Sequence, residues 1–164
     1  MIELPKSVPI PVMQALAAAS ERYGVPLRLL LGVAWVESRF HPGSTGPVTR
    51  SGEQAQGLMQ LMPGTARGLG VDAYNVDQAA DGAARFLKQL QTQFGDWARV
   101  LAAYNWGPGN VSKRGEWAQW PGQVQQYVLN VWRAGQAAPI PFPGKVWQLP
   151  LSPRSSQASE SNRS

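Results

Sequence analysis

The stretch Gly32-Val33-Ala34-Trp35-Val36-Glu37-Ser38-Arg39-Phe40 places one acidic side chain on the apolar face of an expected helix. The apolar run begins directly after Pro26, and proline is favoured at a helix start because its missing N–H is not needed there. Glu37 follows Val33 by four residues and Leu30 by seven, so these three side chains share one face. A Pro-Gly pair soon afterwards stops the helix. The pattern predicts a buried helix with a carboxyl group in its last turn.

Two effects on the Glu37 carboxyl act in the same direction. Burial disfavours the ionised form, and the negative end of the helix dipole disfavours it again. A carboxyl group that keeps its proton near neutral pH is what general acid catalysis requires. The alternative is a glutamate that turns out to solvent or pairs with Arg39, and this stretch alone leaves both interpretations open.

Two further segments belong with this stretch. They are Ala55-Gln56-Gly57-Leu58-Met59-Gln60-Leu61-Met62-Pro63-Gly64-Thr65-Ala66 and Ala102-Ala103-Tyr104-Asn105-Trp106-Gly107-Pro108-Gly109-Asn110-Val111. Together with Glu37-Ser38-Arg39-Phe40, they resemble the three signature motifs of the soluble lytic transglycosylase family, which is related to goose-type lysozyme. The resemblance covers roughly residues 16–132. It implies an all-α, lysozyme-like helical bundle with a substrate cleft.

The resemblance also implies a reaction. Lytic transglycosylases cleave the MurNAc-β-1,4-GlcNAc bond of peptidoglycan with a single carboxyl group and form 1,6-anhydro-MurNAc. Glu37 would act first as general acid toward the bridging oxygen and then as base toward the 6-hydroxyl of the same sugar. The 6-hydroxyl and the stabilising N-acetyl group are tethered to the reacting sugar, so their effective molarity is high. No cofactor is expected.

Eight further residues are candidates for substrate binding because of their places in the motifs. Gly57 leaves room for substrate beside the backbone, and Gln60 offers an amide. Tyr104 offers a phenol for a hydrogen bond to the catalytic carboxyl, and Asn105 is expected to fix the turn that holds it. The full set is Ser38, Gly57, Met59, Gln60, Tyr104, Asn105, Trp106 and Tyr127.

Core packing is the competing interpretation for several aromatic and apolar candidates. Met59 and Tyr127 fit an apolar core as well as they fit a binding site. Trp106, Trp117 and Trp120 crowd the third motif, and their flat faces would suit sugar rings. Packing is favoured for Trp117 and Trp120.

Two alternative functions stay open beside transglycosylation. A goose-type muramidase would add water to the same bond, using Glu37 together with an acidic loop residue such as Glu53. A non-catalytic wall-binding subunit of a secretion or phage machine is an alternative of another class. A non-catalytic subunit would be expected to lack residues of the catalytic site, whereas this sequence retains Glu37, Gln60 and Tyr104.

Composition narrows the class of partner. The 164 residues are 43% hydrophobic with seven tryptophans, which is typical of a globular protein. A monomer is expected. The formal net charge is +5, but the basic residues are scattered, which favours peptidoglycan glycan strands over a nucleic acid. There is no cysteine and no metal-ligand spacing around the single histidine, His41, so no metal site is expected.

The sequence also bears on localisation. No apolar run approaches the length of a membrane span, so no stable membrane insertion is expected. The N-terminus lacks a basic region followed by an apolar core, so no signal peptide is predicted. We expect action in the periplasm or cell wall, reached by phage delivery, by holin release or after removal of a leader. A phage endolysin is the favoured setting.

Local signals divide the chain into three regions. Residues 1–11 form an extended lead-in, residues 12–135 the catalytic domain, and residues 136–164 a Pro- and Ser-rich tail. Within the tail, residues 136–150 are expected to pack through Phe142 and Trp147, and residues 151–164 to be disordered.

Within the catalytic domain, Gly, Pro and capping residues set the expected element boundaries. Asn75 is the expected cap of the longest helix, and Asp96 caps the helix that carries the third motif. The region 41–62 is predicted to be a polar loop with a short extended segment or a small hairpin. Helices are expected over 12–23, 27–37, 65–69, 76–94 and 97–104, and from Pro121 onward.

Overall fold

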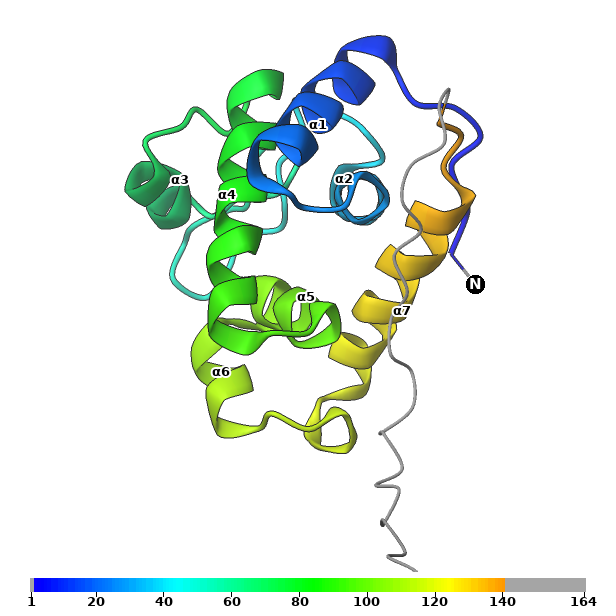
Figure 1. Ribbon diagram of the computed structural model, residues 1–164. Coiled ribbons are helices and arrows are strands. Elements are labelled where there is room, and N and C mark those ends of the chain that lie inside the picture. Colours follow the sequence, from blue (N-terminus) through cyan, green and yellow to red (C-terminus); the bar gives the residue numbers. More distant parts are fainter. Residues whose placement is uncertain (1, 141–164) are drawn as a thin grey trace, which may run out of the picture.

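The computed structural model of this protein describes residues 2–140, and this part of the chain is a helical bundle without a β-strand. Figure 1 shows helix α2 nearly end-on between α1 and α7. The all-α prediction is confirmed. The elements are α1 (Ile10–Tyr23), α2 (Leu27–Ser38), α3 (Pro63–Leu69), α4 (Val76–Phe94), α5 (Trp97–Trp106), α6 (Pro108–Lys113), the 3-10 helix η1 (Trp117–Gln119) and α7 (Gly122–Ala137).

Helix α2 lies in the centre because its middle, residues 29–34, is apolar on every side. A helix that is hydrophobic all round has to be covered by other elements, and α1 and α7 pack against it. Arg39, with a φ of 54°, ends the helix in the left-handed conformation. Glu37 therefore lies in the last turn, as predicted. The fully shielded residues of α2 are Leu29, Leu30, Leu31, Val33 and Ala34.

Helix α4 is amphipathic and packs its apolar stripe against α1 and α5. The Asn75 side chain accepts a hydrogen bond of 3.0 Å from the backbone N–H of Gln78, which satisfies one free N–H group of the first turn. The predicted helix over 76–94 and its Asn75 cap are confirmed. The buried stripe consists of Ala79, Ala80, Ala83, Ala84, Leu87 and Leu90.

Several boundaries differ from the sequence prediction. Helix α1 begins at Ile10, so the extended lead-in is shorter than residues 1–11; Pro11 fits the first turn of the helix rather than preceding it. Helix α7 continues to Ala137, two residues beyond the predicted end of the catalytic domain. The expected packing of residues 136–150 through Phe142 and Trp147, and the expected disorder of residues 151–164, fall almost entirely outside the described residues.

Two short helices were missing from the prediction. Helix α6 begins at Pro108, within a Gly-Pro-Gly sequence that indicates a turn, and η1 follows it. Pro108 occupies the first helical position, where its fixed φ suits a helix. Together these elements connect α5 to α7.

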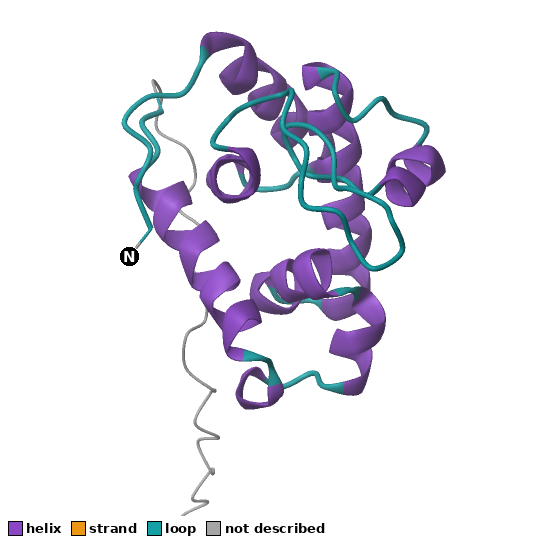
Figure 2. Cartoon of the chain, turned by 180° about the vertical axis from the view of Figure 1, so that it is seen from behind, coloured by secondary structure: helices purple, strands orange, loops and turns teal. Residues whose placement is uncertain are grey.

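The connection between α2 and α3 is a structured loop rather than a hairpin. Its only β-type pairings among the described residues are isolated bridges that join Gln56 to Thr45 and to Leu61. The backbone N–H of Gly46 donates to Ala55 O at 2.8 Å. Figure 2 shows this connection as loop throughout. The extended segment predicted near 41–62 is thus reduced to single bridging residues.

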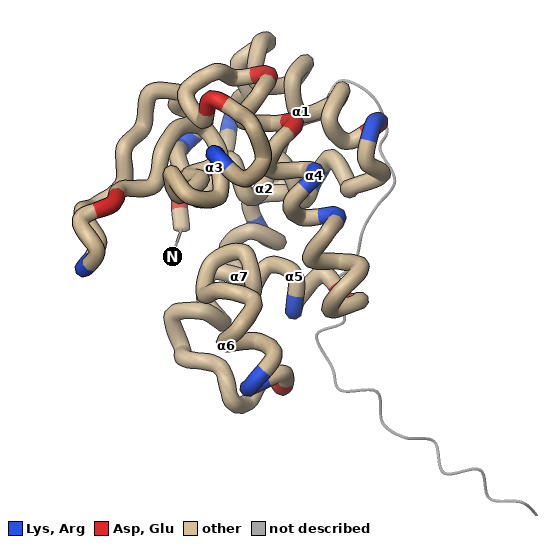
Figure 3. Tube along the Cα trace, turned by 90° about the vertical axis from the view of Figure 1, so that its left-hand side faces the viewer, with Lys and Arg blue, Asp and Glu red and all other residues tan. Residues whose placement is uncertain are grey.

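Charges are spread over the described part of the molecule. Figure 3 shows Lys and Arg interspersed with Asp and Glu along the trace. No helix formed by residues 2–140 has both the length and the apolar character needed to cross a bilayer.

Candidate active site

Glu37 is half-buried in the last turn of α2, one position before the buried Ser38. Burial raises the pKa of its carboxyl from the ordinary value of 4.5 to about 7, because the surrounding apolar groups disfavour the charge. The group is therefore partly protonated at neutral pH. This is the state that general acid catalysis requires.

The carboxyl is held by a phenol from the other end of the sequence. The hydroxyl of Tyr127, on α7, donates a hydrogen bond of 2.7 Å to Oε1 of Glu37. This bond favours the ionised carboxylate and lowers the Glu37 pKa, so it opposes the larger effect of burial. Burial, followed by the charge of Glu37, raises the pKa of Tyr127 well above its ordinary range. Tyr127 thus keeps its proton and remains a donor.

Tyr104 lies near the same carboxyl but does not bond to it. Its hydroxyl donates to the backbone oxygen of Met59 at 2.6 Å. The prediction that Tyr104 hydrogen-bonds the Glu37 carboxyl is therefore wrong, because the Met59 carbonyl takes its only O–H. Burial, followed by the negative charge of Glu37, raises the pKa of Tyr104 well above its ordinary range.

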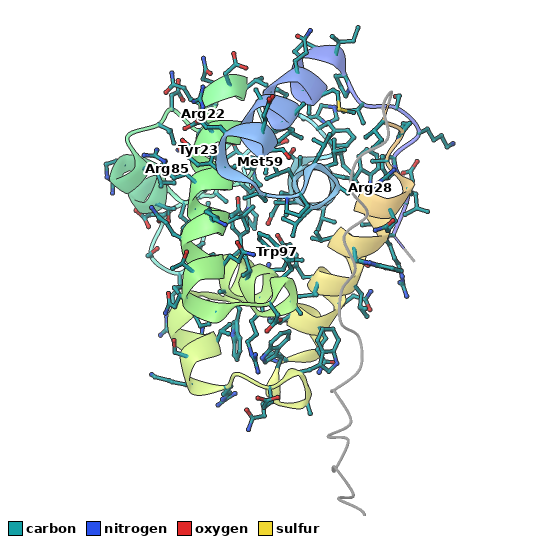
Figure 4. The ribbon with its side chains drawn as sticks, viewed as in Figure 1. Arg22, Tyr23, Arg28, Met59, Arg85 and Trp97 are labelled. Atoms are coloured by element: carbon teal, nitrogen blue, oxygen red, sulfur yellow. The ribbon has the colours of Figure 1, made fainter. Side chains whose placement is uncertain are left out.

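Ser38 and Met59 fasten the loop after α2 to the helix. The hydroxyl of Ser38 lies 2.7 Å from Leu58 O and 3.0 Å from Ala34 O. The Met59 side chain is completely shielded from solvent, and Figure 4 shows it in the interior between the helices. In this structure the Ser38 hydroxyl bonds to backbone oxygens of the protein, and the Met59 side chain packs in the core.

Gly57 makes a close contact within the protein. Its φ is +78°, and a Cβ built on it would lie 1.7 Å from the carbonyl oxygen of Ala73. The glycine is buried, so the room that its missing side chain leaves is filled by the chain before α4. This corrects the expectation that the room beside Gly57 is for substrate.

Gln60 uses its amide to hold its own loop. Its φ is +51°, which is strained for a non-glycine residue. Its Nε2 donates to Gly57 O at 2.9 Å and to Ser44 O at 3.1 Å, so both N–H groups are engaged. The amide that was expected to face substrate instead closes the turn.

Arg39 does not pair with Glu37, which removes the alternative that the sequence left open. Its Nη1 donates to Glu3 O at 3.0 Å, and its guanidinium lies 4.6 Å from the centre of the Trp35 ring. The Trp35 indole N–H donates to the same oxygen at 2.7 Å. The N-terminal segment is thereby attached to the end of α2.

The third motif differs in detail from the prediction. Asn105 is exposed within α5 and makes no side-chain hydrogen bond among the described residues. Asn110 holds the turn instead, donating from Nδ2 to Trp106 O at 2.6 Å. Trp106 is half-buried against the core. The sequence signal for Asn110 was its place in the Gly107-Pro108-Gly109-Asn110 turn.

The rings of Trp117 and Trp120, the two tryptophans after this turn, pack in a tilted arrangement, with ring centres 5.2 Å apart and planes inclined at 51°. Trp120 is 5% exposed and donates from Nε1 to Arg114 O at 2.8 Å, so its packing role is confirmed. Trp117 is 37% exposed, and it packs against Trp120 while part of its ring faces solvent.

Glu53 is the candidate second acid. Its carboxylate lies 4.0 Å from the guanidinium of Arg67 in an exposed pair. Among residues 2–140, desolvation and Tyr127 are the causes of the Glu37 pKa shift, with no contribution from a second carboxylate. The same residues hold no group of His, Cys, Asp and Glu that could bind a metal ion.

A groove of about 470 Å³ lies between the N-terminal segment and the end of α7. It contains none of the candidate site residues, so we do not place a substrate there. Its walls are formed by Ile2, Leu4, Trp132, Arg133, Gln136 and Ala137.

With this geometry established, comparison with known proteins assigns the family. Residues 14–126 match the family described as Transglycosylase SLT domain. The chain belongs to this family. The predicted resemblance is therefore confirmed.

Phage and bacterial relatives of this SLT domain are both found. The transglycosylase of Enterobacteria phage PRD1 is 35% identical over 131 residues, which are 79% of this chain and 47% of that protein. The membrane-bound lytic murein transglycosylase D of Escherichia coli K12 is 34% identical over 111 residues, which are 63% of this chain and 23% of that protein. The chain spans less than half the length of these relatives.

Solved structures agree on the fold. The lytic transglycosylase Slt of Pseudomonas aeruginosa, determined as an inactive glutamate-to-glutamine mutant, superimposes with a TM-score of 0.62 at 26% identity, over 74% of this chain and 23% of that chain. The 70 kDa soluble lytic transglycosylase of Escherichia coli gives a TM-score of 0.63 at 23% identity, over the same shares, which shows likeness of fold alone.

Proposed function

We propose that this SLT domain is a peptidoglycan lytic transglycosylase in which Glu37 is the only catalytic carboxyl group. The observation that supports this most is the Glu37 pKa of about 7 in a site where a buried phenol is the carboxyl's hydrogen-bond partner. A single acid of this kind suits a reaction in which one group first gives and then takes a proton.

The geometry suggests which oxygen carries the proton. Oε1 of Glu37 accepts the hydrogen bond from Tyr127, so the acidic proton resides on Oε2. Glu37 transfers this proton to the oxygen that bridges MurNAc and GlcNAc, the bond from C1 to that oxygen breaks, and positive charge develops on the MurNAc ring. The N-acetyl group of the substrate stabilises that charge.

The second step returns the proton to the same residue. The Glu37 carboxylate, stabilised by the Tyr127 hydroxyl, accepts the proton of the MurNAc 6-hydroxyl. The oxygen of that hydroxyl bonds to C1 and closes the 1,6-anhydro ring. No water is consumed, and Glu37 ends the cycle protonated.

The muramidase alternative assigns Glu53 the activation of a water molecule. In this structure its carboxylate lies beside Arg67, on an exposed part of the loop. Both reactions need a protonated acid, so it is the exposed pairing of Glu53 with Arg67 that favours transglycosylation over the muramidase alternative. A non-catalytic wall-binding subunit needs no carboxyl group whose pKa is raised to about 7.

Digestion of purified peptidoglycan tests the proposal. Mass spectrometry of the products should show anhydro-MurNAc ends, which are one water lighter than reducing ends. Glu37→Gln should abolish product formation, whereas Glu53→Gln should retain it. Exclusively hydrated products, lost in Glu53→Gln, would instead establish the muramidase.

We also propose that the enzyme acts on the cell wall in a phage setting. The PRD1 protein and the peptidoglycan transglycosylase gp16 of Escherichia phage T7 match 79% and 77% of this chain, compared with 63% for the murein transglycosylase D of Escherichia coli. Co-expression with a holin tests release through the membrane: an endolysin lyses cells only with the holin.

A further inference from the structure

Helices α2 and α7 carry Glu37 and Tyr127, and two glycines bring their backbones into direct contact. A Cβ built on Gly32 of α2 would lie 2.2 Å from the carbonyl oxygen of Val131. A Cβ built on Gly135 of α7 would lie 2.2 Å from the carbonyl oxygen of Arg28. Neither glycine has a positive φ, so it is this close approach, not backbone conformation, that requires them.

Arg28 fastens the same helix pair at one end. Its Nη1 lies 3.0, 3.1 and 3.3 Å from the carbonyl oxygens of Gly135, Gln136 and Ala138. The carbonyls of Gly135 and Gln136 belong to the last turn of α7, and Ala138 is the residue directly after it, so the helix itself provides no N–H donor for any of the three. A positive charge there also complements the helix dipole. Figure 4 shows Arg28 beside this end of α7.

The contacts form one antiparallel series. Position 28 of α2 meets position 135 of α7, position 32 meets position 131, and position 37 meets position 127. The bond between Tyr127 and Glu37 is the last member of the series. Glu37 follows Gly32 by five residues, or about 7.5 Å along the helix. A change in the distance between α2 and α7 at Gly32 should therefore also change their distance at Glu37, which lies within about two turns.

We propose that Gly32 and Arg28 are positioning residues, which hold α7 against α2 at the separation that lets the Tyr127 hydroxyl reach Oε1 of Glu37. The inference rests on the proposed role of Glu37 as the acid. Gly135 serves the same contact at the end remote from the acid.

The effect of an added methyl group follows from the distances. A carbon atom and a carbonyl oxygen approach each other to about 3.3 Å, so Gly32→Ala has to separate the helices by about 1 Å. The bond between Tyr127 and Glu37, at 2.7 Å, would then exceed the about 3.0 Å limit for a good O–H···O bond. Glu37 would lose the partner that stabilises its ionised form.

The test is a carbon-13 NMR titration of the Glu37 carboxyl, without substrate. Gly32→Ala should raise the Glu37 pKa by about half a pH unit or more, in the same direction as Tyr127→Phe. In the Tyr127→Phe background, Gly32→Ala should add no further shift, because the bond on which it acts is already absent. Tyr127 and Tyr104 are the titratable groups that interact with Glu37 from α7 and α5.

Two glycines provide matched controls. Gly82 of α4 is also packed, with a built Cβ 2.9 Å from Val71 Cγ2, whereas Gly122 of α7 has no atom within 4 Å of its Cβ position. Neither Gly82→Ala nor Gly122→Ala should move the Glu37 pKa. If Gly82→Ala shifts the Glu37 pKa as much as Gly32→Ala does, the shift is a general effect of overpacking. That result would overturn the proposal.

Other outcomes also decide the matter. An unchanged Glu37 pKa in Gly32→Ala, a downward shift from water entry, or the same shift with and without Tyr127 would each refute the proposal. If Gly32→Ala does not fold, Arg28→Gln loosens the half-exposed end of the pair and should raise the pKa in the same direction. The titration requires no activity, so a failure here is distinct from absence of lysis by the wild type, which would count against the proposed function.

Discussion

The hydroxyl of Tyr127 donates a hydrogen bond of 2.7 Å to Oε1 of Glu37, and this bond joins α7 to α2 through two residues that are 90 apart in the sequence. Burial raises the pKa of this carboxyl, and the hydrogen bond from the phenol lowers it by a smaller amount. The balance places the Glu37 pKa at about 7. An acid with this pKa can both release and recover a proton under the same conditions.

Removing the phenol should make Glu37 a weaker acid. In Tyr127→Phe, the carboxylate loses a hydrogen bond to its charged form, so the Glu37 pKa should rise by about one pH unit. The Glu37 carboxylate that forms after the first step also loses this hydrogen bond. The rate of glycan cleavage at pH 7 should therefore fall about tenfold. The pH profile of cleavage, measured on soluble glycan fragments, checks both effects. Tyr74→Phe, an exposed change, should leave the profile unmoved.

The wild-type rate should fall as the pH rises through about 7. Above this value Glu37 is ionised and has no proton for the bridging oxygen. The descending limb of kcat/KM against pH therefore reports the pKa of the free enzyme's acid. Soluble glycan fragments whose charge is constant over this pH range serve as substrate. They separate the ionisation of Glu37 from pH-dependent binding to the intact cell wall. A descending limb near pH 5 would mean that Glu37 is not buried as described.

Glu37→Gln should stabilise the folded protein at high pH. The folded-state pKa of Glu37 is raised from 4.5 to about 7, so between these values the folded chain binds more protons than the unfolded chain. Wild-type stability therefore falls as the pH rises from about 4.5 to about 7 and stays lowered above it. Glutamine carries no charge to bury. The variant should match the wild type near pH 4 and exceed it by about 3 kcal/mol at pH 8. Urea unfolding at both pH values measures the difference.

The local parts of this site could be predicted from the sequence. The apolar run of α2 and the spacing of Glu37 from Val33 fix a carboxyl in the last turn of a buried helix, because these depend on helical period alone. The capping role of Asn75 follows from residues three apart. The hydrogen-bond partner of the Glu37 carboxyl could not be predicted in this way. Tyr127 was equally consistent with a core residue, and the bond depends on how α7 packs against α2.

The contacts of Ser38 in the first motif, and of Gly57 and Gln60 in the second, could not be predicted for the same reason. A glycine, a serine and a glutamine beside a catalytic acid suggest contact with substrate. In the structure, Ser38, Gly57 and Gln60 bond or pack within the protein instead. Residue type alone does not show whether a small or polar residue faces a ligand or another segment. The carbonyl of Ala73, which fills the space beside Gly57, comes from a loop sixteen residues away.

Gly57 should therefore be required for folding rather than for substrate binding. In Gly57→Ala, the new methyl group would meet Ala73 O at 1.7 Å while the backbone keeps a φ of +78°, so overpacking and strain combine. We expect a loss of about 3 kcal/mol in the free energy of unfolding. Gly52→Ala is the matched control, because its φ is +85° but nothing lies within 4 Å; it should lose only about 1 kcal/mol. Equal losses in urea unfolding would mean that the contact with Ala73 contributes nothing beyond backbone strain.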